Sequence, residues 1–231
     1  MFDLSLMGRF SFAHAQPTKP PLGPGRNHLG IAEERDAVLF VPQNVDVSKP
    51  VPLMVFFHGA GGFPEKILPF IEEHAEQQGF LVLAPHSMLP TWDLVIGGNG
   101  PDLERLEKAL DTVAAHFPLD PTRLAFTGFS DGGSYALSIG LTNGTVVTHI
   151  IVFSGGFMSV MLPEGEPQVF IAHGLQDEQL PIDTSARANR RKLQEAGYDV
   201  SYIEFNGPHA IQPPIVGLAV EFFLGGADPA G

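Results

Sequence analysis

The sequence of 231 residues contains no cysteine. Disulfides, thiolate metal ligands and a cysteine nucleophile are therefore excluded, and the fold must be stabilised by packing. Basic residues are also scarce, because 13 Lys and Arg against 26 Asp and Glu give a formal net charge of −13. Such a surface repels phosphate backbones and anionic bilayers, so we expect no nucleic-acid partner. No apolar run reaches the roughly 20 residues that a membrane-spanning helix needs, so integral membrane association is not expected.

Motifs for metal ions and phosphates are missing as well. Neither HExxH nor a comparable histidine cluster occurs among the nine histidines, and neither GxxxxGK[ST] nor GxGxxG is present. We expect no metal and no cofactor. What the chain has is apolar residues, at 44% of the sequence against 17% charged residues. This composition predicts a folded protein, and the length fits a single domain over residues 1–231.

The N-terminal region resembles a signal peptide only in part. Ala13-His14-Ala15 is similar to a cleavage site, but Asp3 stands where basic residues belong and Arg9 interrupts the apolar stretch. We therefore expect a cytoplasmic location, with secretion as the less favoured alternative. Residues 1–35 are interpreted as an irregular arm, since the segment 16–27 is rich in proline and glycine.

Beyond the arm, short apolar runs alternate with longer amphipathic ones, which is typical of βαβ units. The runs predicted as buried parallel strands are 37–41, 53–57, 80–84, 123–127, 146–153, 169–172 and 200–205. The segments predicted as helices are 67–78, 102–116, 131–141, 183–196 and 215–224. The alternation predicts a doubly wound, mostly parallel α/β sheet with helices on both faces. Its working residues should lie in loops beyond the carboxyl ends of the strands.

The stretch GFSDGG (128–133) lies between a predicted strand and a predicted helix. It satisfies the GxSxG pattern in the context that a nucleophile elbow requires. In such an elbow the backbone of Ser130 is strained, and side chains at 128 and 132 would collide with their surroundings. The alternative interpretation is a glycine-rich turn in which the serine caps the helix. The presence of catalytic partners decides between the two.

A serine hydroxyl is a weak nucleophile at neutral pH, so it needs a base and an acid that orients the base. The segment HGLQDEQLP (173–181) follows the predicted strand 169–172. It places Asp177 in the loop at the end of that strand, where the orienting acid of an α/β-hydrolase lies. Glu178 and Asp183 are the alternatives for this role.

The last predicted strand, 200–205, is followed by Asn206-Gly-Pro-His209. No other histidine comes after Asp177, so His209 is the candidate base. The chain order Ser130, Asp177, His209 is the order expected for α/β-hydrolases.

A tetrahedral intermediate also needs donors for its oxyanion. The N–H of Asp131, directly after the serine, is the first candidate. The predicted strand 53–57 runs into the loop HGAGG (58–62), whose glycines allow close approach of backbone to substrate. The second donor is expected to be the N–H of Ala60, with Gly61 as the alternative. The histidine of this loop is expected to brace it rather than to transfer protons.

Apolar residues near the predicted strand ends are candidates for the walls of a substrate pocket. Trp92 is either part of such a wall or core filler. The other candidates are Gly61, Phe63, Phe157, Met158, Met161 and Leu180.

Together, HGAGG, APHS with the later Trp92, GFSDGG, HGLQDEQLP and GPH resemble the phospholipase/carboxylesterase family of α/β-hydrolases, over about residues 36 to 224. The resemblance implies an α/β-hydrolase fold without a large cap domain, with Ser130 as nucleophile, Asp177 as acid and His209 as base. It also implies that Ala60 and Asp131 are the oxyanion donors. Acyl-protein thioesterases of this family commonly carry glutamine where this chain has Asp131. The difference favours a hydrolase of small esters over a protein-depalmitoylating enzyme.

The sequence therefore predicts a serine carboxylesterase that cleaves short- to medium-chain esters of small molecules through an acyl-enzyme. A thioesterase or lysophospholipase with the same catalytic residues is the alternative, and a non-catalytic binding protein with this fold is a remote one. The oligomeric state is left open, with a homodimer as one option.

Overall fold

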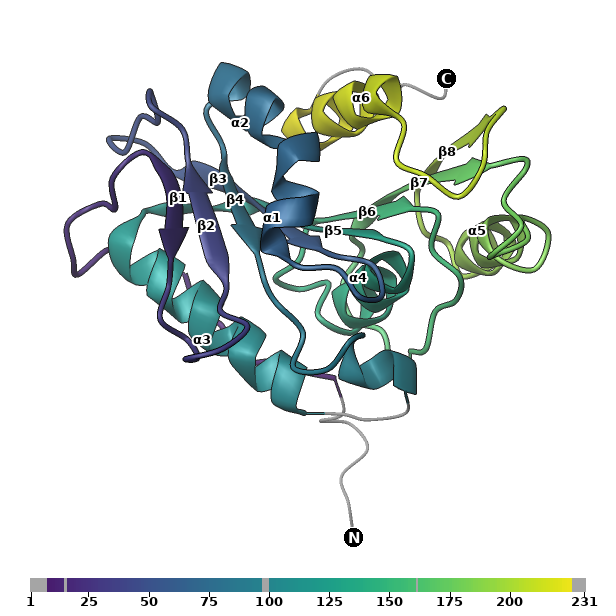
Figure 1. The fold of residues 1–231 in the computed structure, drawn as a ribbon, viewed down its shortest axis with the longest axis horizontal. Coiled ribbons are helices and arrows are strands. Elements are labelled where there is room, and N and C mark those ends of the chain that lie inside the picture. The colour runs from purple at the N-terminus through teal and green to yellow at the C-terminus, as the bar shows by residue number, and fades with distance from the viewer. Residues whose placement is uncertain (1–7, 15, 97–99, 161, 226–231) are drawn as a thin grey trace, which may run out of the picture.

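The computed structural model describes residues 8–14, 16–96, 100–160 and 162–225. These residues contain a sheet in the order β1-β2-β4-β3-β5-β6-β7-β8 (Figure 1). The strands are β1 (Gly25–His28), β2 (Val38–Val41), β3 (Val51–Phe57), β4 (Leu81–Ala84), β5 (Leu119–Phe129), β6 (His149–Phe153), β7 (Gln168–Gly174) and β8 (Val200–Phe205). From β4 to β8 all neighbouring strands are parallel, whereas β1 and β2 pair antiparallel at one edge.

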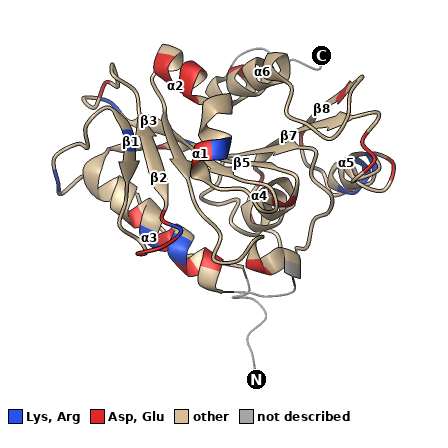
Figure 2. Ribbon diagram, in the orientation of Figure 1, with Lys and Arg blue, Asp and Glu red and all other residues tan. Residues whose placement is uncertain are grey.

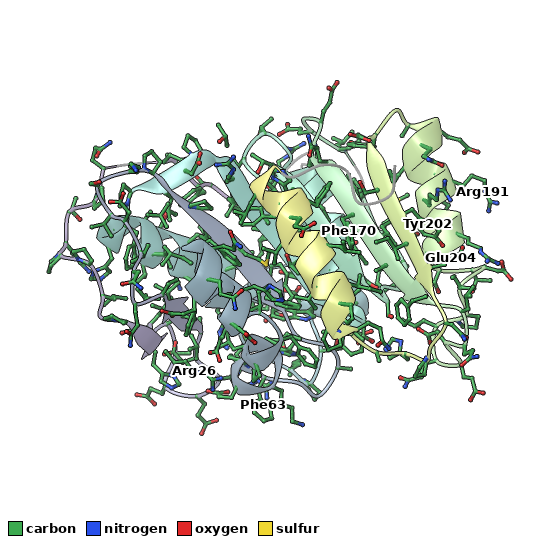
Figure 3. The ribbon with its side chains drawn as sticks, turned by 90° about the horizontal axis from the view of Figure 1, so that it is seen from above. Arg26, Phe63, Phe170, Arg191, Tyr202 and Glu204 are labelled. Atoms are coloured by element: carbon green, nitrogen blue, oxygen red, sulfur yellow. The ribbon has the colours of Figure 1, made fainter. Side chains whose placement is uncertain are left out.

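Helices cover both faces of this sheet, as Figure 1 shows. They are α1 (Pro64–Ile67), α2 (Glu72–Gln78), α3 (Pro101–His116), α4 (Asp131–Thr142), α5 (Ala186–Glu195) and α6 (Pro213–Leu224), with 3₁₀ turns η2 (Leu68–Phe70) and η3 (Asp93–Ile96). Helices α3, α4 and α5 bury apolar side chains in one core on one face, and α2 and α6 bury theirs in a second core on the other face. In Figure 3, Phe170 of β7 lies beneath α6, where its ring packs against Phe222 at 5.6 Å between centroids. The predicted doubly wound α/β fold is confirmed.

The N-terminal arm is more regular than the sequence indicates. Residues Gly25–His28 form the edge strand β1 and pair antiparallel with β2. The prediction of an irregular segment from 1 to 35 is therefore wrong at these residues. Prolines and glycine surround the strand, and an edge strand exposed on one side carries no continuous apolar run that could have revealed it.

The segment 67–78, predicted as one helix, is interrupted. It consists of the last residue of α1, the turn η2 and the helix α2. Pro69 has no N–H to donate, and its ring blocks a regular helix through this point. The strand predicted from 146 begins only at His149, because the N–H groups of Val146 and Val147 bond to Asn143 in a turn.

The parallel strands point their carboxyl ends in one direction, so the loops after β3, β4, β5, β7 and β8 meet at one edge of the sheet (Figure 1). Each predicted catalytic residue lies in one of these loops. Among the helices described, none combines the length and the apolar character needed to cross a membrane.

Candidate active site

The turn between β5 and α4 consists of one residue, Ser130, with φ of +56° and ψ of −122°. This is a strained conformation for a residue with a side chain. The N–H of Ser130 donates to the carbonyl of Phe153 on β6 at 3.0 Å, which anchors the turn to the sheet. A Cβ atom at Gly128 would overlap the backbone of Gly132, and one at Gly132 would overlap the carbonyl oxygens at the end of β3. Both glycines are therefore required by close backbone contacts.

The structure brings Ser130, His209 and Asp177 together in one chain of hydrogen bonds. His209 Nδ1 lies 2.6 Å from Asp177 Oδ2, and His209 Nε2 lies 2.9 Å from Ser130 Oγ. Because an ionised carboxylate only accepts, Nδ1 carries the proton and Nε2 is free to accept from the serine hydroxyl. The arrangement can thus move the hydroxyl proton onto the imidazole.

Asp177 is buried, and each of its carboxylate oxygens is held. Oδ1 accepts the N–H groups of Gln179 at 3.0 Å and Leu180 at 2.8 Å, while Oδ2 accepts from His209. Burial alone would raise the pKa of this carboxyl, but the N–H of Leu180 and the imidazole of His209 more than offset it. The pKa of Asp177 therefore lies below its ordinary value, and the group is ionised at neutral pH.

The alternatives for the acid lie elsewhere. Glu178 is exposed beside Asp177 and makes no contact with His209. Asp183 is exposed and forms an ion pair with Arg187 at 2.9 Å. Neither is placed to orient the imidazole.

A second histidine contacts the same carboxylate and was missed by sequence reasoning. His173, at the end of β7, is completely buried, and its Nε2 lies 3.1 Å from Asp177 Oδ2 and 2.8 Å from the carbonyl of Leu180. Both oxygens accept, so Nε2 carries the proton and donates. Burial lowers the pKa of His173, which keeps the ring neutral. The signal was a histidine at the end of a buried strand with an aspartate four residues later.

The two predicted oxyanion donors have N–H groups that bond to no other described residue. These are the N–H groups of Ala60 and Asp131. The alternative donor, Gly61, is already engaged, because its N–H donates to the carbonyl of Pro90 at 2.6 Å. The loop HGAGG lies against Ser130, since a Cβ atom at Gly59 would be 3.3 Å from Ser130 Cβ.

A buried histidine, His58, holds the loop HGAGG in place through two hydrogen bonds. His58 Nε2 accepts the N–H of Ser87 at 3.2 Å, so Nδ1 carries the proton and donates to the carbonyl of Gly59 at 2.7 Å. Burial lowers the pKa of His58 to about 4, so the ring is neutral near pH 7. The expectation that His58 braces the loop agrees with these contacts.

Trp92 does not line the cavity that lies between the loop HGAGG and α1. Its side chain is 1% exposed, stacks on Tyr135 at 4.8 Å between ring centroids, and donates its indole N–H to the carbonyl of His58 at 2.8 Å. The interpretation of Trp92 as pocket lining is therefore corrected: it is a core residue that supports the loop HGAGG. Thr91 next to it donates its hydroxyl to the carboxylate of Asp131 at 2.7 Å.

A cavity of about 310 Å³ lies between the loop HGAGG and α1. Its lining residues are His58, Gly59, Ala60, Gly61, Gly62, Lys66, Ile67, Phe70 and Phe129.

Of the predicted pocket residues, Gly61 lines this cavity and the other described ones do not. The ring of Phe63 lies under the ammonium group of Lys66. Phe157 is exposed, Met158 packs against the core, and Leu180 lies against Gly156. Met161 lies outside the described residues.

No group of three or more metal-ligating side chains is arranged to hold a metal ion within the part of the chain that the structure describes. The groups near Ser130 are proton donors and acceptors, and the cavity beside it is mostly apolar. Such a site can bind an uncharged organic group next to a nucleophile.

Comparisons with known proteins agree with this chemistry. The family described as "Putative esterase" matches residues 106–193, which include Ser130 and Asp177. Feruloyl esterase C of Emericella nidulans is 27% identical, over 89% of this chain and 88% of that protein. The chain has the α/β-hydrolase fold and is similar in sequence to esterases. A probable feruloyl esterase C of Aspergillus niger is 24% identical over 74% of this chain, but the match spans only 65% of that relative's length.

Solved structures of esterases share this fold. A phospholipase/carboxylesterase from Dyadobacter fermentans superimposes with a TM-score of 0.64 at 21% identity, over 81% of this chain and 95% of that chain. The fold implied by the resemblance to phospholipase/carboxylesterases is thereby confirmed.

Proposed function

We propose that the protein is a serine carboxylesterase in which Ser130 is the nucleophile, His209 the general base and Asp177 the orienting acid. The observation that carries the proposal is the continuous hydrogen-bond chain from Asp177 through His209 to the hydroxyl of Ser130. A binding protein without catalysis would not need a strained serine whose hydroxyl lies 2.9 Å from an imidazole nitrogen.

In the first half-reaction His209 Nε2 takes the proton of Ser130 as Oγ attacks the ester carbonyl carbon. The carbonyl oxygen becomes an oxyanion, which the N–H groups of Ala60 and Asp131 stabilise. The intermediate then collapses, the C–O bond to the alcohol breaks, and His209 gives its proton to the leaving alkoxide. In the second half-reaction water loses a proton to His209, attacks the acyl-enzyme and releases the acid and Ser130.

The cavity of about 310 Å³ supports esters with a short- to medium-sized substituent, because two of its lining residues, Gly59 and Phe129, lie next to Ser130. Esters of aromatic acids are a second candidate. The relatives are named feruloyl esterases, and the rings of Phe70 and Phe129 belong to the cavity wall, where an aromatic group can pack. Thioesters would be cleaved by the same groups, so rates on matched oxygen esters and thioesters distinguish a thioesterase.

Replacement of Ser130 by alanine tests the proposal. With 4-nitrophenyl acetate and butyrate we expect kcat to fall by roughly 10⁴-fold or more, because the nucleophile is lost. Ser159→Ala is the matched control, since this exposed serine follows β6 and does not line the cavity. Circular dichroism verifies that both variants fold. Wild-type turnover in Ser130→Ala would exclude the proposed nucleophile.

A further inference from the structure

The cavity beside Ser130 has one charged side chain. Ile67, Phe70 and Phe129 supply carbon surface, and the backbone of residues 59–62 supplies the rest of the wall. The other ionisable group is His58, whose pKa near 4 leaves it uncharged at neutral pH. The remaining charge is the ammonium group of Lys66.

Lys66 is oriented by its neighbours. It lies on α1, where it is exposed, and its Nζ is 4.8 Å from the centroid of the Phe63 ring; Phe63 is labelled in Figure 3. This is a cation–π contact, which restricts the lysine without neutralising it. Figure 2 shows an acidic position beside it on α1, which is Glu65, but Glu65 is not part of the cavity wall. No carboxylate of the described residues forms an ion pair with Lys66.

Lys66 is thus a cation without an ion-pair partner among the described residues, at a mostly apolar cavity. The formal net charge of −13 means that an anionic ester is repelled by most of the surface. The carboxylate of Asp131, next to the nucleophile, is bonded to Thr91 and does not line the cavity. A negative group on a substrate is therefore favoured in the cavity, near Lys66, and disfavoured elsewhere around Ser130.

We propose that Lys66 selects esters that carry a free carboxylate. The apolar walls of the cavity take the carbon chain, and the carboxylate at its far end pairs with the ammonium group of Lys66. The preferred substrates are thus half-esters, such as monoesters of dicarboxylic acids, rather than fully uncharged esters. This inference rests on the proposed function and adds the charge of the substrate to it.

The test compares esters that differ only in charge. Monoethyl adipate is paired with the ethyl ester of adipamic acid, in which a carboxamide replaces the carboxylate. A second pair, 4-acetoxybutanoate and 4-acetoxybutanamide, puts the charge on the alcohol side. For each pair the ratio of kcat/KM, carboxylate over carboxamide, is measured at low ionic strength in the wild type, Lys66→Gln, Lys66→Glu and Lys66→Arg.

In at least one pair we expect the ratio to fall about 3- to 10-fold in Lys66→Gln and further in Lys66→Glu, as Coulomb attraction across a partly solvated site predicts. Lys66→Arg should keep most of the wild-type ratio. Added salt should reduce the wild-type ratio, because the ammonium group is exposed. Lys108→Glu, an exposed lysine on α3 away from the cavity, makes the same change in net charge and should leave the ratio within about twofold.

Unchanged ratios in both pairs for Lys66→Gln and Lys66→Glu would overturn the proposal. So would an equal fall in Lys108→Glu, since the effect would then come from net charge. Ser130→Ala is measured on all four esters as well. If it abolishes their hydrolysis while the Lys66 variants leave the ratios unchanged, the charge selection fails and the proposed nucleophile stands.

Discussion

Two histidine–glycine pairs lie on opposite sides of the strand that precedes the proposed nucleophile Ser130, and they hold the site in different ways. His58-Gly59 follows β3, and His173-Gly174 ends β7, with β5 between them in the sheet. Both imidazoles are buried, and burial lowers the pKa of each. Each ring is therefore neutral and donates one N–H to the carbonyl of a loop residue.

The difference lies in the second partner of each ring. His58 bonds to the backbone of Ser87 and Gly59, so it positions the loop that carries the proposed oxyanion donor, the N–H of Ala60. His173 also reaches the charged oxygen of Asp177, which orients His209. Thus one histidine, His58, holds backbone groups on one side of β5. The other, His173, contacts the carboxylate of Asp177 on the other side. Loss of His173 should therefore disturb proton transfer. Loss of His58 should disturb only the proposed oxyanion donors.

The largest effect is expected for His173→Leu. Asp177 loses a donor to its charged oxygen, and a hydrogen bond to a charged group corresponds to about 10- to 100-fold in kcat. KM should change by less than about threefold, because His173 does not touch the substrate cavity. The pKa of the Asp177 carboxyl should rise, so the ionised carboxylate is lost at a higher pH. The acid limb of the pH–rate profile should therefore move to higher pH.

His173→Gln serves as the control, because a glutamine amide N–H can reach where Nε2 lies. It should restore kcat to within about fivefold of wild type. It should also move the acid limb of the pH–rate profile back to its wild-type position. If leucine and glutamine reduced kcat equally without moving the profile, His173 would only fill space.

A smaller effect is expected for His58→Leu. The N–H of Ser87 and the carbonyl of Gly59 lose their partners, which should lower the free energy of unfolding by about 1–3 kcal/mol in urea titrations. The looser loop should reduce kcat about 3- to 10-fold, less than deletion of an oxyanion donor. The acid limb should stay where it is in the wild type, and a shift like that of His173→Leu would contradict the division of roles.

The smallest effect on turnover is expected for His149→Phe, which replaces a buried histidine that lies away from the site. His149 begins β6, away from the site, with its ring edge-on to Phe222 at 5.4 Å, and burial lowers its pKa to about 4. Between pH 6.5 and 4 the unfolded chain binds the proton and the folded chain does not, so the free energy of unfolding falls as pH falls. In His149→Phe this fall should be shallower by about 1–2 kcal/mol at pH 4.5 relative to pH 7.

The measurement is urea unfolding of wild type and His149→Phe at both pH values. Turnover at pH 7 should be the same in the two proteins, since the ring lies outside the cavity. If the free energy of unfolding changed equally with pH in wild type and His149→Phe, His149 would not stay neutral in the folded chain.

The features that could be predicted from sequence are those that local chemistry dictates. Gly128 and Gly132 flank the serine because any side chain there would overlap backbone, and that requirement is visible as a motif. The buried parallel strands are continuous apolar runs. The order of Ser130, Asp177 and His209 follows from the topology, which brings the carboxyl ends of β5, β7 and β8 to one edge.

The features that were missed depend on contacts between distant segments. β1 is a strand because β2 offers an open edge, and no pattern within Gly25–His28 reports that partner. Trp92 could equally line a pocket or fill the core, and only the carbonyl of His58 and the ring of Tyr135 decide. The contact of His173 with Asp177 depends on the fold of the loop after β7, where the N–H of Leu180 also holds the carboxylate.

The central claim, that His209 and Asp177 activate Ser130, is tested most directly by covalent labelling. The protein is treated with a fluorophosphonate at pH 7, and peptide mass spectrometry locates the adduct. The account predicts one adduct, on Ser130, that forms at least about 100-fold more slowly in His209→Ala. An adduct on another residue with Ser130 unmodified, or equal labelling rates with and without His209, would contradict it.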